Sequence, residues 1–179
     1  MELEVLPPDI NESFGDFTAL PGKDGQPDKI RFGLHTIKNL GEEISNVIVK
    51  ERKDHGPYKN LSNFLDRVTH QNLNRRSLEA LIKSGAMDSF GNRGQMLASI
   101  DDILSYSKEN QQQGKDQTSI FGLISEDMPA PALKLKEVDP VPLEELLGWE
   151  KELLGLYISG HPLEKFRERF KDKKDIVAH

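Results

Sequence analysis

Between Leu34 and Glu109 the apolar residues recur at intervals of three and four positions, and this spacing constrains the fold more than any other feature. An α-helix turns once in about 3.6 residues, so each such run predicts a short amphipathic helix with one buried face. Turn-forming residues interrupt the spacing at 39–41, 56–60, 69–74 and 84–92. The sequence therefore predicts a mainly α fold with a compact helical unit over residues 34–109.

The segments on either side of this unit differ from it in composition. Residues 1–33 are rich in Pro and Gly, and two short runs that favour β structure, 17–20 and 30–32, flank a turn-rich stretch. We expect an arm there with a small N-terminal β-hairpin. Residues 110–142 contain a glutamine run and several prolines, which predicts a flexible Pro-rich linker. Helical spacing returns from Leu143, within a helical segment expected over 143–179, whose abrupt end suggests a fragment of a longer chain.

The first turn of the helical unit has the pattern of a helix-hairpin-helix motif. Two apolar residues, Leu34 and Ile37, precede Gly41, and a second helix follows. The first backbone N–H groups of a helix lack partners within the helix, and together with the helix dipole they attract anions. Gly41 has no Cβ atom, so a sugar-phosphate chain can approach closely. Such a hairpin grips the DNA backbone and not the base edges, which predicts sequence-independent and salt-sensitive binding.

A second, imperfect copy of the motif begins at Leu78, where Leu81 and Gly85 repeat the spacing and a longer turn follows. Two copies in one segment favour phosphate binding. A glycine between two amphipathic helices can also serve as a turn alone, and Glu42 and Glu43 would repel a phosphate at the first hairpin. The residues that we expect to contact DNA are Lys38, Asn39, Gly41, Arg75, Arg76, Lys83, Gly85 and Arg93.

The distribution of charge supports this expectation, although the total does not. Lys and Arg number 24 and Asp and Glu number 30, which gives a formal net charge of −6. Residues 29–94, however, hold 12 basic and 7 acidic side chains, a net charge of +5, so the rest of the chain carries −11. A basic middle with acidic flanks suits a middle that faces DNA. The alternative is a solvated helical surface with scattered Lys and Arg.

The composition excludes several other classes of protein. No stretch approaches the ~20 apolar residues that cross a bilayer, and the N-terminus lacks the charged-then-apolar pattern of a signal peptide. The absence of cysteine excludes a disulfide scaffold, a thiol nucleophile and a thiolate zinc site. We therefore expect a soluble, cytoplasmic protein that does not bind membranes.

Six short motifs follow one another along nearly the whole chain. They are VLPPDINES (5–13), IRFGLHTIKNLGEE (30–43), GPYKNLSNFLDRV (56–68), LIKSGAMDSFGNR (81–93), QTSIFG (117–122) and EKELLGLYISGHPLEKF (150–166). In this order they resemble the alpha subunits of bacterial DNA polymerase III, the C-family replicative polymerases. A collinear set of six motifs is far more specific than one hairpin.

The resemblance implies a non-catalytic place in such a polymerase. The N-terminal arm would end the fingers domain, the tandem hairpins over 34–109 would hold duplex DNA behind the active site, and the last segment would lead toward an oligonucleotide-binding barrel. The family holds its two metal ions with aspartates of an upstream palm domain, and no matching motif is present here. Asp101 and Asp102 fit a solvated helix start, and the five histidines lack ligand spacing. We expect no catalytic residue, metal or cofactor in this chain, although its parent is expected to be a DNA-directed DNA polymerase.

The linker contains a candidate clamp-binding peptide. Gln117, Thr118, Ser119, Ile120 and Phe121 fit the pattern Gln-x-x-(Leu/Ile)-Phe at the place where the resemblance puts such a peptide. The Gln117 amide can donate and accept hydrogen bonds, and Ile120 and Phe121 are apolar residues in a polar linker. Alternatively, these apolar side chains pack back on the helices as a small cluster. The expected partners are duplex DNA, the sliding clamp (beta subunit) and other polymerase III holoenzyme subunits.

Three hypotheses follow. The first is a polymerase region that tethers the enzyme to duplex DNA and to the sliding clamp. The second is a protein-interaction module of the replisome with no DNA affinity of its own, in which the hairpins only pack helices. The third is a helix-hairpin-helix repair nuclease, which the lack of a carboxylate cluster disfavours.

Overall fold

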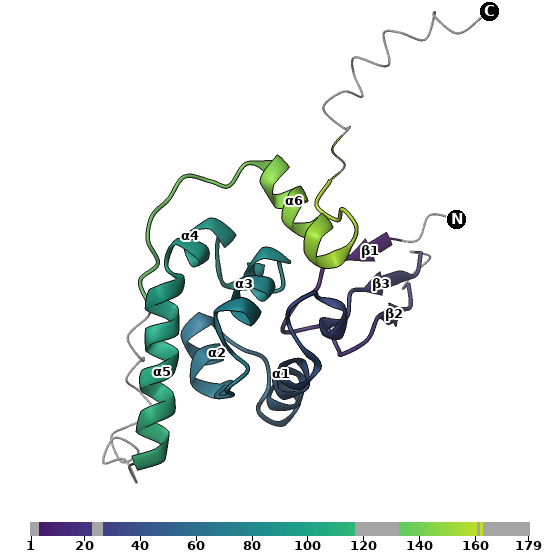
Figure 1. The fold of residues 1–179 in the computed structure, drawn as a ribbon. Coiled ribbons are helices and arrows are strands. Elements are labelled where there is room, and N and C mark those ends of the chain that lie inside the picture. The colour runs from purple at the N-terminus through teal and green to yellow at the C-terminus, as the bar shows by residue number, and fades with distance from the viewer. Residues whose placement is uncertain (1–3, 23–26, 117–132, 161, 163–179) are drawn as a thin grey trace, which may run out of the picture.

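The computed structural model describes residues 4–22, 27–116, 133–160 and 162, and shows a small sheet beside a cluster of helices (Figure 1). The sheet contains β1 (Glu4–Leu6), β2 (Thr18–Leu20) and β3 (Lys29–Arg31) in the order β1-β3-β2. β2 and β3 are antiparallel, so the predicted hairpin is present. β1 pairs with β3 in parallel and was not expected, since three residues before two prolines carry no recognisable alternation.

The rest of the described chain is helical, which confirms the mainly α fold. The elements are η1 (Leu34–Thr36), α1 (Glu42–His55), α2 (Leu61–Arg67), α3 (Arg75–Lys83), η2 (Asp88–Phe90), α4 (Arg93–Ala98), α5 (Ile100–Asp116) and α6 (Leu143–Leu154). The breaks between helices fall where turn-forming residues interrupt the apolar spacing. One expected helix is shorter than its spacing suggests, because the segment before the first hairpin forms only the 3₁₀ turn η1 and is extended again at Ile37.

The apolar faces of the helices meet in one core. Its fully buried side chains include Phe32, Leu34, Ile48, Phe64, Leu65, Leu78, Leu81 and Ile103. Leu153 and Leu154 of α6 belong to the same core, so α6 is docked on the helical unit. In Figure 1, α6 lies across the unit between β1 and α3. No helix among the described residues is long and apolar enough to span a membrane.

The segment expected as a linker is partly ordered against the helices. α5 continues to Asp116, so the start of the segment is helical. At the other end, residues 133–142 run extended, and their backbone is held by two serines: Leu133 N–H donates to Ser62 Oγ at 3.3 Å and Lys136 N–H to Ser99 Oγ at 2.8 Å. The stretch between these ends, which contains the clamp-binding pattern, lies outside the described residues.

Candidate nucleic-acid interface

The first hairpin turn presents an open helix start. Asn39 and Gly41 both have a φ of 73°, which turns the chain sharply into α1. Gly41 also has a ψ of 145°, a combination that suits glycine and strains other residues. Within the described residues, no heavy atom beyond its chain neighbours lies within 4 Å of the place where a Cβ atom on Gly41 would sit. A sugar-phosphate chain can therefore approach the backbone closely at this point.

The start of α1 differs from the starts of the three helices that follow it. Asn60, Asn74 and Asn92 cap α2, α3 and α4, each accepting hydrogen bonds from backbone N–H groups of the first turn. The residue before α1 is Gly41, and no side chain among the described residues caps this helix. Its first N–H groups have no carbonyl partner within the helix and carry the positive end of the helix dipole. An anion can satisfy them.

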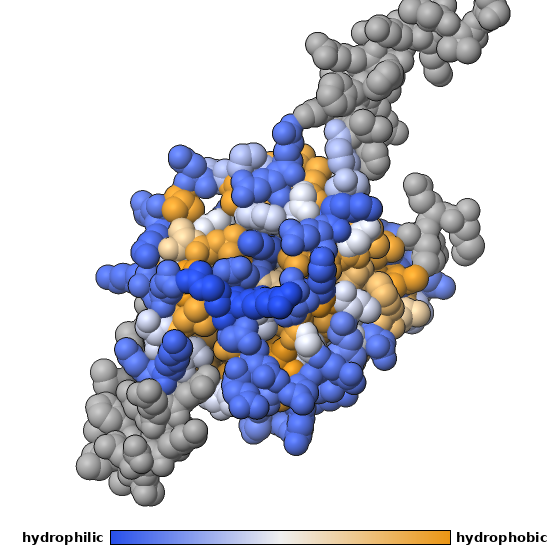
Figure 2. Space-filling view, viewed as in Figure 1, coloured by the Kyte–Doolittle hydropathy of each residue, from blue (hydrophilic) through white to orange (hydrophobic). Residues whose placement is uncertain are grey.

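Two basic residues accompany this open helix start. Arg76, at the beginning of α3, is exposed, and its Nη2 donates to Asn39 Oδ1 at 2.7 Å. The Lys38 side chain in the turn is also exposed. The structure thus brings together Lys38, Asn39, Gly41 and Arg76, half of the positions expected to contact DNA. Figure 2 shows the most hydrophilic colour in a band across the middle of the visible face, over the position of α3 in Figure 1.

Two carboxylates reduce the positive potential at this site. Glu42 and Glu43 are both exposed in the first turn of α1, as the sequence indicates. Glu43 Oε2 accepts a hydrogen bond from Asn72 Nδ2 at 2.5 Å, which ties this carboxylate to the loop before α3. The helix start is therefore electrostatically mixed, and its affinity for phosphate depends on the neighbouring cations Lys38 and Arg76.

Arg75 points toward α5 and not toward the first hairpin. Its guanidinium binds Asp101 and also Glu79, at 3.3 Å. The hydrogen bond to Asp101 raises the pKa of Arg75, so the side chain keeps its charge. It borders a groove of about 440 Å³ between α3 and α5, together with Leu104 and Lys108. Contact of Arg75 with DNA stays a prediction, separate from the first hairpin.

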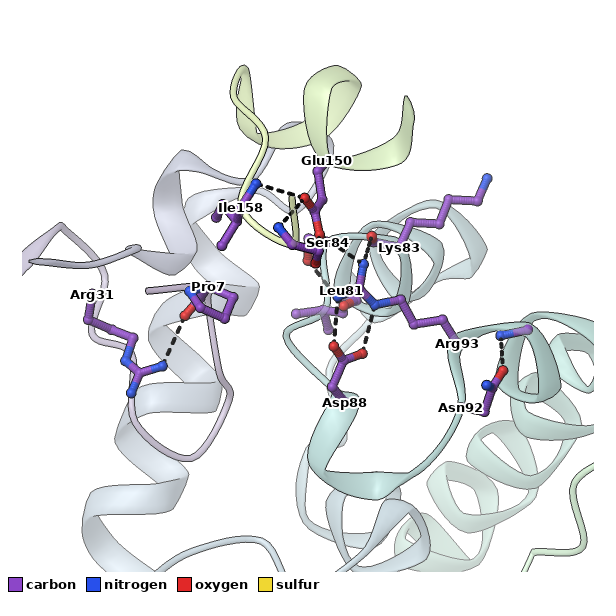
Figure 3. A network of polar contacts seen from close by, with 12 residues as sticks. Pro7, Arg31, Leu81, Lys83, Ser84, Asp88, Asn92, Arg93, Glu150 and Ile158 are labelled. Atoms are coloured by element: carbon purple, nitrogen blue, oxygen red, sulfur yellow. Dashed lines mark hydrogen bonds and ion pairs between the residues drawn. The ribbon is translucent and has the colours of Figure 1, made fainter. Parts of the chain in front are cut away.

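The second hairpin is closed, in contrast to the first (Figure 3). Arg93 is only 8% exposed, and it binds Asp88 through two parallel hydrogen bonds of 2.8 and 2.7 Å. Gly85 has a φ of 84°, and a Cβ atom on it would lie 2.3 Å from Arg93 Nη2. The expected pair Gly85 and Arg93 is therefore in contact, but the glycine makes room for the arginine and not for a ligand. We leave both residues out of the exposed interface.

Lys83 is also occupied. Its Nζ lies 3.9 Å from a Glu79 carboxylate oxygen and 5.8 Å from the centre of the Trp149 ring on α6. Its backbone carbonyl accepts from Arg93 Nη1 at 3.3 Å. The three basic or glycine positions expected at the second hairpin therefore all belong to one network that includes α6.

The residue that completes this network is Glu150 of α6, which is 1% exposed. Its Oε1 lies 3.4 Å from Arg93 Nη1 and accepts a hydrogen bond from the Ser159 hydroxyl. Its Oε2 accepts hydrogen bonds from the backbone N–H groups of Ile158 and Ser159, at 2.8 and 2.9 Å. Burial alone would raise the pKa of Glu150, but the Ser159 and Ile158 hydrogen bonds and Arg93 together lower it below its ordinary value. The carboxylate is therefore ionised inside the protein.

The expectations from sequence did not include Glu150 or Asp88. Leu147, Glu150 and Leu154 are spaced three and four residues apart, so all three lie on the buried face of α6. This spacing is the sequence signal from which a buried carboxylate at Glu150 could have been predicted. Asp88 had no comparable sign, because its pairing with Arg93 depends on the shape of the turn between α3 and α4.

Nothing in the described residues indicates metal chemistry. No group of three or more His, Cys, Asp or Glu side chains that could hold a metal ion occurs among them. Asp101 and Asp102 lie in the first turn of α5, where they bind Arg75 and Lys136. The clamp-binding pattern, Gln117 to Phe121, lies outside the described residues and stays a prediction.

The fold and the first hairpin define a helix-hairpin-helix protein. The chain belongs to that family, because the sequence model of the protein family described as "Helix-hairpin-helix motif" matches residues 2–96. The chain is similar to proteins named DNA polymerase III subunit alpha. It is 38% identical over 164 residues to the one from Thermus aquaticus, 41% over 169 residues to the one from Deinococcus radiodurans, and 40% over 168 residues to the one from Bacillus subtilis. These matches cover 92–93% of this chain but only 12–14% of the relatives' length.

Proposed function

We propose that this chain binds the sugar-phosphate backbone of duplex DNA, without sequence preference, through its first hairpin. The observation that carries the proposal is the uncapped start of α1, open at Gly41 and flanked by Lys38 and Arg76. Backbone N–H groups and cations recognise phosphates, which every DNA sequence offers in the same form. The relatives are named as subunits of a DNA polymerase, which supports DNA as the ligand.

The same similarity supports a place for this chain inside a longer polymerase subunit. It spans about an eighth of its relatives' length. In this proposal its contribution to the parent enzyme is to hold the duplex, while catalysis resides elsewhere. In this proposal it acts in the bacterial cytoplasm, where the chromosome is copied.

Fluorescence anisotropy with two unrelated duplexes tests the DNA-binding proposal. Replacing Lys38 and Arg76 together by Ala removes two phosphate contacts, so we expect affinity to fall about 10-fold for both duplexes and the salt dependence to become shallower. Lys59→Ala is the control, because Lys59 is also exposed and lies just before α2, outside the hairpin.

Equal binding by the double variant and the control would contradict the proposal. An absence of binding by the unmodified chain at low salt would favour the protein-interaction module instead. That alternative draws support from Arg52 and Arg93, which are buried and cannot contact DNA as they stand.

We also propose that Gln117–Phe121 binds the sliding clamp and tethers the polymerase to it. The pattern of one amide and two adjacent apolar side chains supports the proposal. The described residues on both sides of the peptide belong to the helical unit: α5 ends at Asp116, and Leu133 is hydrogen-bonded to Ser62. A clamp bound to the peptide would therefore stay close to the duplex held by the first hairpin.

Binding to an immobilised sliding clamp tests this second proposal. Replacing Ile120 and Phe121 together by Ala removes the two apolar anchors, each worth roughly 1.5–3 kcal/mol on burial, so micromolar binding should become undetectable. The matched control replaces Leu123 and Ile124 by Ala, which removes similar apolar area just outside the pattern. Similar loss in both double variants would count against the assignment.

A further inference from the structure

We infer that α6 is a removable cover over the second hairpin, in which the Glu150 carboxylate occupies the position that a DNA phosphate takes when the cover is displaced. This inference rests on the proposed DNA-binding function and adds a second, latent phosphate site to it. In the closed form the first hairpin is available to DNA and the second is not.

The guanidinium of Arg93 has one poorly satisfied edge. Asp88 binds Nε and Nη2 at 2.8 and 2.7 Å, the usual length for a charged pair. The partners of Nη1 are more distant, with Lys83 O at 3.3 Å and Glu150 Oε1 at 3.4 Å. The Nη1 edge of Arg93, which faces α6, can therefore donate hydrogen bonds to an anion, but its contact with the Glu150 carboxylate is long.

Glu150 is held mainly by its own segment. Its short hydrogen bonds come from Ile158 (Figure 3) and Ser159, which lie four and five residues after the end of α6. If α6 moved away together with residues 155–159, the carboxylate would keep these partners and lose only the long contact to Arg93. The interface between Glu150 and the second hairpin is therefore built to separate at that contact.

α6 also touches two further residues that the sequence predicts to contact DNA, Lys83 and Lys38. Trp149 lies over Lys83, and the carbonyl of Leu153 accepts from the Lys38 N–H at 3.0 Å. The carbonyls at the end of a helix carry a partial negative charge, and the Glu150 carboxylate carries a full one. The cover thus places negative charge where the second hairpin, and the edge of the first, would otherwise receive phosphates.

The Arg93 network also borders the molecular surface. A cleft of about 360 Å³ opens between the second hairpin and the approach to α6, lined by Asn92, Arg93, Val141, Leu146 and Ser159 among others. The cover is nevertheless closed in the chain as it stands, because Leu147, Leu153 and Leu154 of α6 are buried. Displacement therefore requires a competitor, and duplex DNA already bound at the first hairpin is at high local concentration.

The test compares duplex binding by Glu150→Gln with that by Glu152→Gln. Both variants remove one negative charge from α6, but Glu152 is exposed. We expect Glu150→Gln to bind at least about threefold more tightly than Glu152→Gln, with a salt dependence steeper by about 0.9 in log–log slope, because one more phosphate is engaged. Equal affinity and equal slope would overturn the inference.

A second pair of variants covers the case in which Glu150→Gln does not fold. Leu147→Asp undocks α6, and Leu143→Asp adds the same charge at an exposed position of the same helix. The added charge opposes DNA, so tighter binding by Leu147→Asp than by Leu143→Asp supports the cover, and equal or weaker binding overturns it. Loss of the fold in both Glu150→Gln and Leu147→Asp also overturns it, since a removable cover is not needed for folding.

The same titrations separate the two claims. If the unmodified chain binds duplex DNA in a manner that depends on Lys38 and Arg76, while Glu150→Gln matches Glu152→Gln, only the cover is wrong. If no variant binds duplex DNA, the proposed function itself is wrong.

Discussion

Arginine has two different roles in this chain. Arg52 is buried, and its Nη1 and Nη2 donate to the carbonyls of Ile10 and Ser13 at 2.6 and 2.8 Å, which fastens the N-terminal arm to α1. Arg67 similarly binds the carbonyls of Glu51 and Gly56 at the end of α1. Arg76, in contrast, is exposed beside the first hairpin. The charge of +5 counted over residues 29–94 therefore overstates what the surface offers to DNA.

Replacing Arg52 by Gln tests the structural role. The shorter amide cannot reach both carbonyls, so we expect the free energy of unfolding in urea to fall by about 2–3 kcal/mol. Duplex affinity of the folded fraction should not change. Lys53→Gln is the control, because Lys53 is exposed next to it, and its stability should stay within about 0.5 kcal/mol of the unmodified chain. A stable Arg52→Gln variant with weakened DNA binding would contradict this assignment.

The helices and the two hairpins differ in how well they could be predicted from the sequence. Apolar spacing and turn residues predicted the helical unit, and the β2–β3 hairpin followed from two short runs around a Gly- and Pro-rich turn. The first hairpin was predictable because its glycine and its neighbours are local. The closure of the second hairpin was not, because Glu150 lies 57 residues from Arg93 along the chain and only the docking of α6 brings them together.

The docking of α6 should depend on pH through Glu150. Its pKa in the folded chain is lowered, so its stabilising contribution is complete above the ordinary glutamate pKa of about 4.3 and is lost as the pH falls through the folded value. The unmodified chain should thus be more stable to unfolding than Glu150→Gln by about 1–3 kcal/mol at neutral pH, and this difference should narrow as the pH falls below the ordinary glutamate pKa. A gap that does not change with pH would contradict an ionised Glu150.

The whole molecule separates its functions along the chain. The helical unit carries the first hairpin, α6 closes the second one, and the candidate clamp peptide lies between α5 and the extended segment that begins at Leu133. The chain spans about an eighth of its relatives' length. In our proposal, other regions of the parent polymerase catalyse DNA synthesis. In the same proposal, this part supplies attachment, to DNA by the helical unit and to the clamp by the peptide.

The most direct test of the central claim is an NMR titration of the isotope-labelled chain with a short duplex at low salt. If the first hairpin binds phosphates, the backbone amide signals of Gly41, Glu42 and Glu43 will shift with added duplex and return as salt is raised. Duplex-dependent shifts that leave the amides of Gly41 to Glu43 unmoved would contradict the account.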